Sequence, residues 1–247
     1  YTIGSDTLVA ELSQLECGEV LIGDPYSYRL INYHRYEPWK IIPSNTEALE
    51  ARLEQVTSTI LDKLITSVEG RTIVVPLSAG LDSRLIVSGL HHKGYRNVRC
   101  ISYGLPGNYE ARISKKIAQH LGFDWCFWPY TNASQKTHFA SRRHHDYLRF
   151  ADSFCSTPFI QDLAALDGLK ESGFIPEDAV IVNGNSGDFI SGAHVPAALA
   201  ETPVEHDLAK EKVLIISEIV KKHFRLWMQL ATPENDLHIG QANLLKL

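Results

Sequence analysis

The 247-residue chain has few cysteines, and their spacing serves neither a metal nor a disulfide framework. Cys17, Cys100, Cys126 and Cys155 lie far apart and form no CxxC pair. This spacing excludes the zinc-finger and disulfide-stapled classes of small domain. Cys100 and Cys126 lie inside apolar runs, so we interpret them as small buried core residues. A reducing, cytoplasmic setting is therefore predicted.

Long hydrophobic runs and an excess of positive charge are also missing. No apolar stretch approaches the roughly 20 residues of a membrane span, and the first residues do not resemble a secretory signal. The formal net charge is −5 at pH 7. This value argues against a general nucleic-acid binder, although a local basic groove stays compatible with it.

Two widespread nucleotide-binding motifs, GxxxxGK[ST] and GxGxxG, are absent as well. Residues 73–87 offer a different loop, in which a β-branched apolar run ends at small polar residues and helical apolar spacing begins. The pattern predicts a strand, a tight loop and a helix. The N–H groups of a helix start attract anions. Ser78 and Ser83 add hydroxyl donors, and Ala79 and Gly80 allow close approach of a ligand. The loop is therefore predicted to bind phosphate.

Strands and helices alternate from residue 44 onward. The predicted helices span 44–70, 83–92, 108–121, 135–151 and 160–172, and the predicted strands span 72–77, 97–103, 123–128 and 179–182. A further helix of about 25 residues is predicted from Glu205. This alternation predicts an α/β fold with a doubly wound, mostly parallel sheet flanked by helices. Ligands of such sheets bind at the carboxyl ends of the strands.

Residues 1–43 have a different pattern. The stretches 19–22 and 28–35 are typical of two strands joined by a turn at 23–25. A single hairpin is not stable alone, so it is expected to pack on the next domain or to end a larger sheet. The chain does not begin with Met and stops inside an apolar pattern at 242–247. We therefore expect a fragment of a longer protein.

A carboxylate stands among the anion-binding groups of the first loop. Asp82 would repel a phosphate unless a divalent cation lay between them, and Mg²⁺ is commonly held by one or two carboxylates plus substrate phosphates. Asp188 lies in a second glycine-rich loop, 183–192, which also follows a predicted strand. We therefore predict that two loops share one metal and one polyphosphate.

These residues resemble a known family. Residues 77–83 resemble the SGGxDS pyrophosphate loop of the N-type ATP pyrophosphatases. Residues 182–188 resemble the second glycine-rich motif of asparagine synthetases and β-lactam synthetases. Residues 101–104 are similar to the strand end that contacts adenine in that family. The resemblance covers roughly residues 70–195, with order and spacing kept.

The resemblance implies an adenine nucleotide alpha hydrolase-like fold and a ligase that uses ATP and Mg²⁺. It would adenylate a small-molecule carboxylate with release of pyrophosphate, and ammonia or an amine would then displace AMP to form an amide. The ATP-binding residues implied are Ser78, Ala79, Gly80, Asp82, Ser83, Ser102, Tyr103, Gly104, Gly184, Asn185 and Gly187. Asp82 and Asp188 are implied as the catalytic metal ligands.

The family's full members carry an N-terminal glutaminase that begins with a nucleophilic cysteine. This chain begins with Tyr1, and residues 1–43 resemble the tail of that domain. Residues 44–247 would then be the synthetase domain, truncated at its C-terminus. The glutaminase domain missing from this chain could supply the nitrogen, and a homodimer is compatible with such an enzyme.

Two departures bear on the second half of the reaction. Asn185 stands where asparagine synthetases have a glutamate, and Asp188-Phe189 replaces their Asp-Glu pair. An amide cannot act as a general base, so proton removal from the attacking amine is unassigned, as is the family's late-acting lysine. Asparagine as the product is therefore not implied. The variant is more similar to asparagine-synthetase-like proteins associated with surface-polysaccharide or secondary-metabolite amidation.

Two other functions stay open. Another ATP pyrophosphatase could modify a nucleotide or a tRNA base, although the acidic net charge disfavours tRNA. A non-catalytic ATP-binding module is favoured by Asn185, Phe189 and the missing glutaminase. The sequence has two His-His pairs, at 91–92 and 144–145. Neither pair is predicted to bind a metal with both of its histidines, because adjacent residues on a helix point in different directions.

Overall fold

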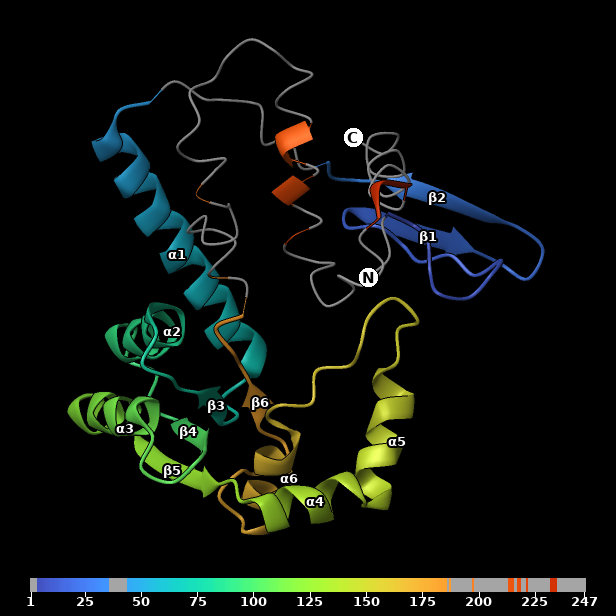
Figure 1. Ribbon diagram of the computed structural model, residues 1–247. Coiled ribbons are helices and arrows are strands. Elements are labelled where there is room, and N and C mark those ends of the chain that lie inside the picture. Colours follow the sequence, from blue (N-terminus) through green and yellow to red (C-terminus); the bar gives the residue numbers. More distant parts are fainter. Residues whose placement is uncertain are drawn as a thin grey trace. The chain divides into compact units, whose positions relative to one another are not determined.

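The computed structural model describes residues 4–35, 44–185 and 187, with further positions at 197, 213–215, 217, 218, 221 and 232–234. The chain divides into two compact units. One comprises residues 1–40, 152–157 and 192–247, and the other comprises residues 41–151 and 158–191. The second unit holds the four-stranded sheet and helices α1 to α6, and each unit is described by itself (Figure 1).

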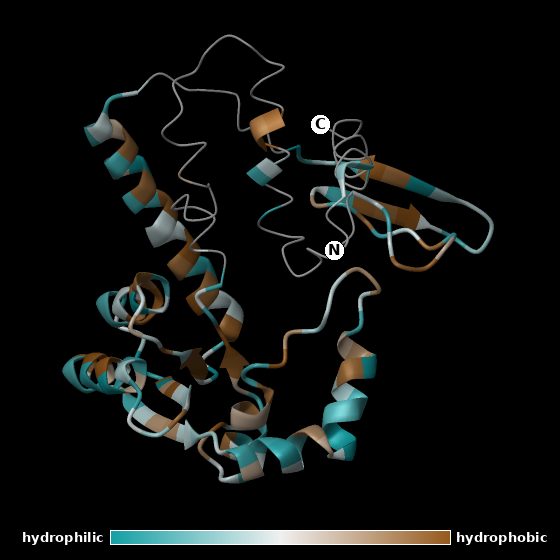
Figure 2. Cartoon of the chain, in the orientation of Figure 1, coloured by the Kyte–Doolittle hydropathy of each residue, from teal (hydrophilic) through white to brown (hydrophobic). Residues whose placement is uncertain are grey.

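The sheet of the second unit is parallel. Its strands are β3 (Ile73–Pro76), β4 (Val98–Gly104), β5 (Asp124–Pro129) and β6 (Val180–Ile181). They lie in the order β5-β4-β3-β6, with β3 paired to both β4 and β6. The predicted α/β fold is thereby confirmed. Figure 2 shows β3 in the apolar colour, as expected for a strand covered on both faces.

Helices cover both faces of this sheet. Side chains alternate along β3, so Ile73 and Val75 pack into one core cluster and Val74 into the other. The first cluster includes residues of α1 (Thr46–Val68), α2 (Leu81–His92) and α3 (Tyr109–Leu121). The second includes Leu169 of α6 (Leu163–Glu171). The predicted doubly wound arrangement is therefore present.

Local side-chain caps explain where two of these helices begin. The Asn45 carboxamide oxygen accepts a hydrogen bond from the Ala48 N–H at 2.8 Å, and that of Asn108 accepts one from the Ala111 N–H at 2.7 Å. Each cap satisfies a backbone donor that has no partner inside the helix. Both starts agree with the sequence prediction.

Two predicted helix boundaries are wrong. The single helix predicted over 135–151 is two helices, α4 (Asn132–Phe139) and α5 (Arg142–Ala151). The break occurs because the Ser141 hydroxyl accepts a hydrogen bond from the His144 N–H at 3.2 Å and so starts a new helix. The helix predicted from residue 160 begins at residue 163. Its preceding backbone is held elsewhere, since the Gln161 carbonyl oxygen accepts a hydrogen bond from the Tyr130 hydroxyl.

The apolar stripe predicted along α1 is buried only near the sheet. Leu61 and Val68 are buried, whereas the side chains of Leu49 and Leu53 remain about half exposed. The last turns of α1 therefore supply its contribution to the core.

The first unit contains the predicted β-hairpin. Strands β1 (Glu19–Gly23) and β2 (Tyr28–Asn32) pair antiparallel, and the Asp24 carboxylate accepts hydrogen bonds from two N–H groups of the turn, each at 2.8 Å. Its origin in a glutaminase-like domain stays a prediction. The helix predicted from residue 205 lies largely outside the described residues. Among the helices of the described residues, none has the length and apolarity needed to span a membrane.

Candidate active site at the carboxyl ends of the sheet

The strands of the sheet are parallel, but the order in which the chain adds them reverses at β3. From β3 the chain passes to β4 on one side, and β6 later joins on the other side. The two connections leave a crevice at the carboxyl ends of β3 and β6, which is where open α/β sheets bind their ligands. Both loops predicted to form the site follow these two strands.

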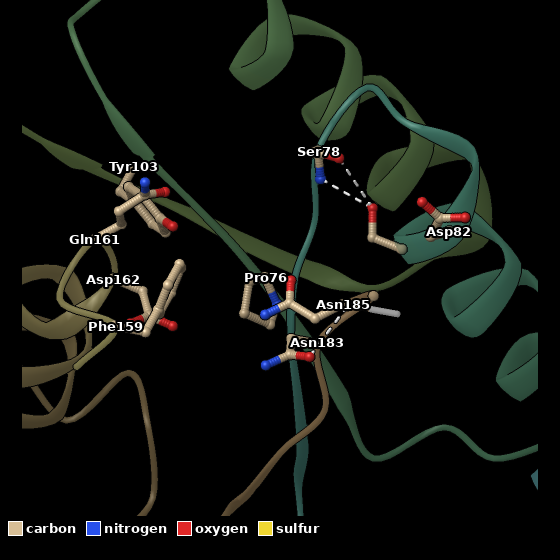
Figure 3. A pocket seen from close by; sticks show the side chains of 11 residues that line it. Pro76, Ser78, Asp82, Tyr103, Phe159, Gln161, Asp162, Asn183 and Asn185 are labelled. Carbon is tan, nitrogen blue, oxygen red and sulfur yellow. Dashed lines mark hydrogen bonds between the residues drawn. The ribbon is translucent and has the colours of Figure 1, made fainter. Parts of the chain in front are cut away.

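A pocket with a cavity volume of about 290 Å³ lies at this position. Four segments line it: the end of β3 with the first loop, the end of β4, the residues before α6, and the loop after β6 (Figure 3). The lining residues are Pro76, Ser78, Asp82, Ser83, Tyr103, Phe159, Gln161, Asp162, Asn183, Gly184 and Asn185.

The first loop is held by its own hydroxyl groups. The Ser83 hydroxyl accepts a hydrogen bond from the Ser78 N–H at 3.1 Å and lies 3.2 Å from the Ser78 hydroxyl, which accepts one from the Gly80 N–H. Within the described part of the chain, no side chain caps α2. The N–H groups of its first turn therefore remain available to an anion.

The second loop packs directly on Asp82. A Cβ atom built on Gly187 would lie 2.2 Å from the Asp82 Oδ1 atom, and one built on Gly184 would lie 2.8 Å from the Ser83 backbone nitrogen. Neither position has room for a side chain without movement of the first loop. The structure thus brings together two glycine loops that are about a hundred residues apart in the sequence.

The metal predicted for this junction is only partly defined by the described residues. The Asp82 carboxylate lines the pocket beside two serine hydroxyls, and oxygen ligands of this kind suit Mg²⁺. Among the described residues, no group of three or more His, Cys, Asp or Glu side chains is arranged so that it could hold a metal ion. Mg²⁺ needs only one or two carboxylates when phosphates complete its shell, so the fit is acceptable. Asp188 lies outside the described residues and stays a prediction.

The Ser102 hydroxyl joins three elements behind the pocket. It donates to the Leu77 carbonyl oxygen at 2.7 Å, lies 2.6 Å from the Ser114 hydroxyl, and accepts from the Trp125 indole N–H at 3.1 Å. This hydroxyl is buried and already paired. An adenine contact at Ser102 would have to come from its backbone.

The predicted residues therefore fall into three groups. Those that line the pocket are Ser78, Asp82, Ser83, Tyr103, Gly184 and Asn185. Gly187 does not line it but packs on Asp82. Those that lie outside the lining are Ala79, Gly80, Ser102 and Gly104.

One wall of the pocket was not predicted from the sequence. It is formed by Phe159, Gln161 and Asp162, which precede α6. The Tyr130 hydroxyl donates to the Gln161 carbonyl oxygen at 2.7 Å, and the Tyr130 ring stacks on that of Tyr103 with centroids 5.3 Å apart. These contacts hold the wall against the carboxyl ends of β4 and β5.

Residues 60–166 match the family model for asparagine synthase. The resemblance drawn from the sequence is confirmed over these residues, which include the first loop, the end of β4 and the wall before α6. No curated protein matches the chain. A solved structure of the NH3-dependent NAD synthetase from Campylobacter jejuni subsp. jejuni NCTC 11168, in complex with the nitrate ion, is 12% identical with a TM-score of 0.39. The matched region covers 78% of this chain and 95% of the NAD synthetase chain.

The described lining of the pocket is acidic, and the pKa of one of its carboxyl groups is raised. Burial raises the pKa of Asp162 from its ordinary value. Burial, followed by the charges of Asp162 and Glu110, raises the pKa of Tyr103, and burial raises that of Tyr130. Both phenols therefore stay neutral at physiological pH. Among the described residues, the pocket lining contains the carboxylates Asp82 and Asp162 and no Lys, Arg or His side chain.

Proposed function

We propose that the chain carries an ATP-dependent, amide-forming synthetase of the asparagine synthetase type. It adenylates a small-molecule carboxylate and releases pyrophosphate. The observation that supports this most directly is the packing of Gly184 and Gly187 on Asp82. This contact lies at the start of α2, which no side chain caps among the described residues, and beside the point where the strand order of the sheet reverses. The asparagine synthase match over residues 60–166 supports the same reading.

The first loop binds the pyrophosphate part of ATP. The N–H groups of the first turn of α2 and the Ser78 hydroxyl donate to phosphate oxygens. Asp82 holds Mg²⁺, with Asp188 proposed as the second ligand. When bound, the metal neutralises phosphate charge and so makes pyrophosphate a better leaving group. The glycines of the second loop let its backbone approach this group closely.

Tyr103 forms the wall for the adenine ring. Its ring is supported from behind by Tyr130, and stacked aromatic rings offer a planar apolar face. Ser102 fixes the end of β4 through the Leu77 carbonyl oxygen and thereby sets the distance between this wall and the first loop.

The reaction has two steps. A carboxylate oxygen of the acid attacks the α-phosphorus of ATP, and the bond from that phosphorus to the bridging oxygen breaks as pyrophosphate leaves. The nitrogen nucleophile then attacks the acyl carbon, and the bond to the AMP oxygen breaks as the amide forms. The residues around Asp82 serve the first step by stabilising the departing pyrophosphate.

The wider setting is proposed with the function. Ammonia or an amine supplies the nitrogen. Its source is a glutaminase domain, of which residues 1–43 are the tail. The reaction takes place in the cytoplasm. Residues 44–247 are the proposed synthetase domain.

Acid-dependent exchange of labelled pyrophosphate into ATP tests the first step. We expect exchange with at least one acid of a panel that contains L-aspartate, L-glutamate, acetate and D-glucuronate, and none without acid. ATP binding with no exchange for any acid would contradict the proposal. That result would favour a non-catalytic ATP-binding module, the reading that Asn185 in the pocket lining supports.

A further inference from the structure

The amide-forming step needs a proton acceptor that the second loop does not provide. An amine is mainly protonated at neutral pH and must lose a proton before its lone pair can attack. Asn185 lines the pocket, but its carboxamide cannot take up a proton. Of the two carboxylates that line the pocket among the described residues, Asp82 is assigned to the metal, which leaves Asp162.

Asp162 lies on the opposite wall of the pocket from the first loop. Figure 3 shows Asp162, Phe159 and Tyr103 on one side and Ser78 and Asp82 on the other. Asp162 is therefore separated, across the pocket, from the loop junction where pyrophosphate is proposed to bind.

The ordinary structural roles of a carboxylate do not account for Asp162. It is the residue before α6, yet its side chain makes no capping hydrogen bond. Among the described residues its carboxylate has no ion-pair partner, and Arg143 of α5 pairs instead with Asp167 at 2.6 Å. The titratable groups facing Asp162 are the phenols of Tyr103 and Tyr130.

The environment of Asp162 disfavours its charged form. Burial raises its pKa even though a helix start favours a negative charge. A carboxylate whose pKa is raised is better suited to accept a proton than an unperturbed one. Half-buried carboxylates with a raised pKa that line a pocket are candidates for functional residues.

We propose that Asp162 receives the nitrogen nucleophile, binding it as an ammonium ion or a primary ammonium group and accepting its proton. This inference rests on the proposed function. The part of the lining that the structure describes has no cationic side chain to repel such a ligand. An ammonium group has three N–H donors, and the carboxamide oxygen of Asn185 can accept one of those that Asp162 leaves free.

The step balances without a further reagent. One ammonium proton passes to an Asp162 carboxylate oxygen, which leaves a neutral amine with its lone pair. That pair forms the C–N bond to the acyl carbon, the C–O bond to AMP breaks, and AMP leaves with the bonding electrons. The second nitrogen proton passes to solvent, and Asp162 loses its own proton before the next turnover.

The variant Asp162→Asn in the full chain tests this role, with an acid that supports pyrophosphate exchange in the wild type. We expect the variant to retain pyrophosphate exchange, because exchange does not depend on the amine, and its own exchange rate is the reference for its amide formation. Amide formation with methylamine should fall by about 100-fold or more. Hydroxylamine, which is uncharged at neutral pH, should retain most of its turnover. Glu171→Gln, an exposed carboxylate on the same helix, is the matched control and should change none of these rates.

Each other outcome counts against the inference. Loss of exchange together with amide formation would assign Asp162 to ATP binding or to folding. Equal losses with methylamine and hydroxylamine, or no loss with either, would show that Asp162 neither binds nor deprotonates the nucleophile. Absence of exchange in the wild type with every acid would instead overturn the proposed function, and this inference with it.

Discussion

Single residues define this site through contact rather than through charge alone. Asp82 becomes informative because Gly187 and Gly184 approach it so closely that a Cβ atom on either would collide with the first loop. Asp162 becomes informative because burial acts on a carboxylate that no cation neutralises among the described residues. The first residue could be chosen from the sequence. The second could not, because no local pattern marks it.

Gly187→Ala should weaken ATP binding. The added methyl group would lie 2.2 Å from Asp82 Oδ1 and must displace either the carboxylate or the loop. Such a displacement typically costs about 1–3 kcal/mol, so we expect the Kd for ATP to rise about tenfold, as measured by calorimetry. Gly94→Ala is the control, since Gly94 has a positive φ but nothing near its Cβ position. An unchanged Kd in Gly187→Ala would contradict the close packing of the two loops.

Asp162→Asn should stabilise the fold at neutral pH. The pKa of Asp162 is raised above 3.8 in the folded state, so between 3.8 and the folded pKa the folded protein holds more protons than the unfolded one. Stability of the wild type therefore falls as pH rises through this window, and the cost is complete above the folded pKa. Asparagine has no such cost.

Urea unfolding at several pH values measures the difference. The advantage of Asp162→Asn over the wild type should grow as pH rises from about 4 and then level off. A variant that is less stable than the wild type at neutral pH would show that the carboxylate has a structural partner.

Among the elements, β3, β4 and β5 with α2 and α3 could be predicted because their apolar periodicity agrees with the tertiary structure. Asn45 and Asn108 cap α1 and α3 close to the helix starts predicted from the sequence. The break between α4 and α5 could not be predicted, since the Ser141 cap competes with a continuous helical pattern. The wall before α6 was missed because Tyr130, about thirty residues earlier, holds it in place.

Ser102→Ala should destabilise the second unit. It would leave the buried Leu77 carbonyl and the Trp125 indole N–H without the Ser102 partner, at a cost of about 1–3 kcal/mol in unfolding free energy. Urea denaturation compares it with Ser88→Ala, an exposed serine of α2 that should change stability little. Equal stabilities would show that the Ser102 network does not join these strands.

At the scale of the whole molecule, topology locates the site. The order β5-β4-β3-β6 places the reversal of strand order between β3 and β6, the two strands that precede the glycine loops. Alternating strands and helices made the fold class predictable, and the family model matches within the same region, at residues 60–166. The position of Asp162 at the pocket depends on long-range packing and so could be found only in the structure.

The most direct test of the central claim compares wild type and Asp82→Asn in acid-dependent pyrophosphate exchange. The account predicts exchange in the wild type with at least one acid of the panel. It also predicts a fall of about 100-fold or more in Asp82→Asn, because the metal that would neutralise the departing pyrophosphate loses a carboxylate ligand. Exchange that is equally fast in Asp82→Asn would contradict the assignment of this loop junction as the ATP site.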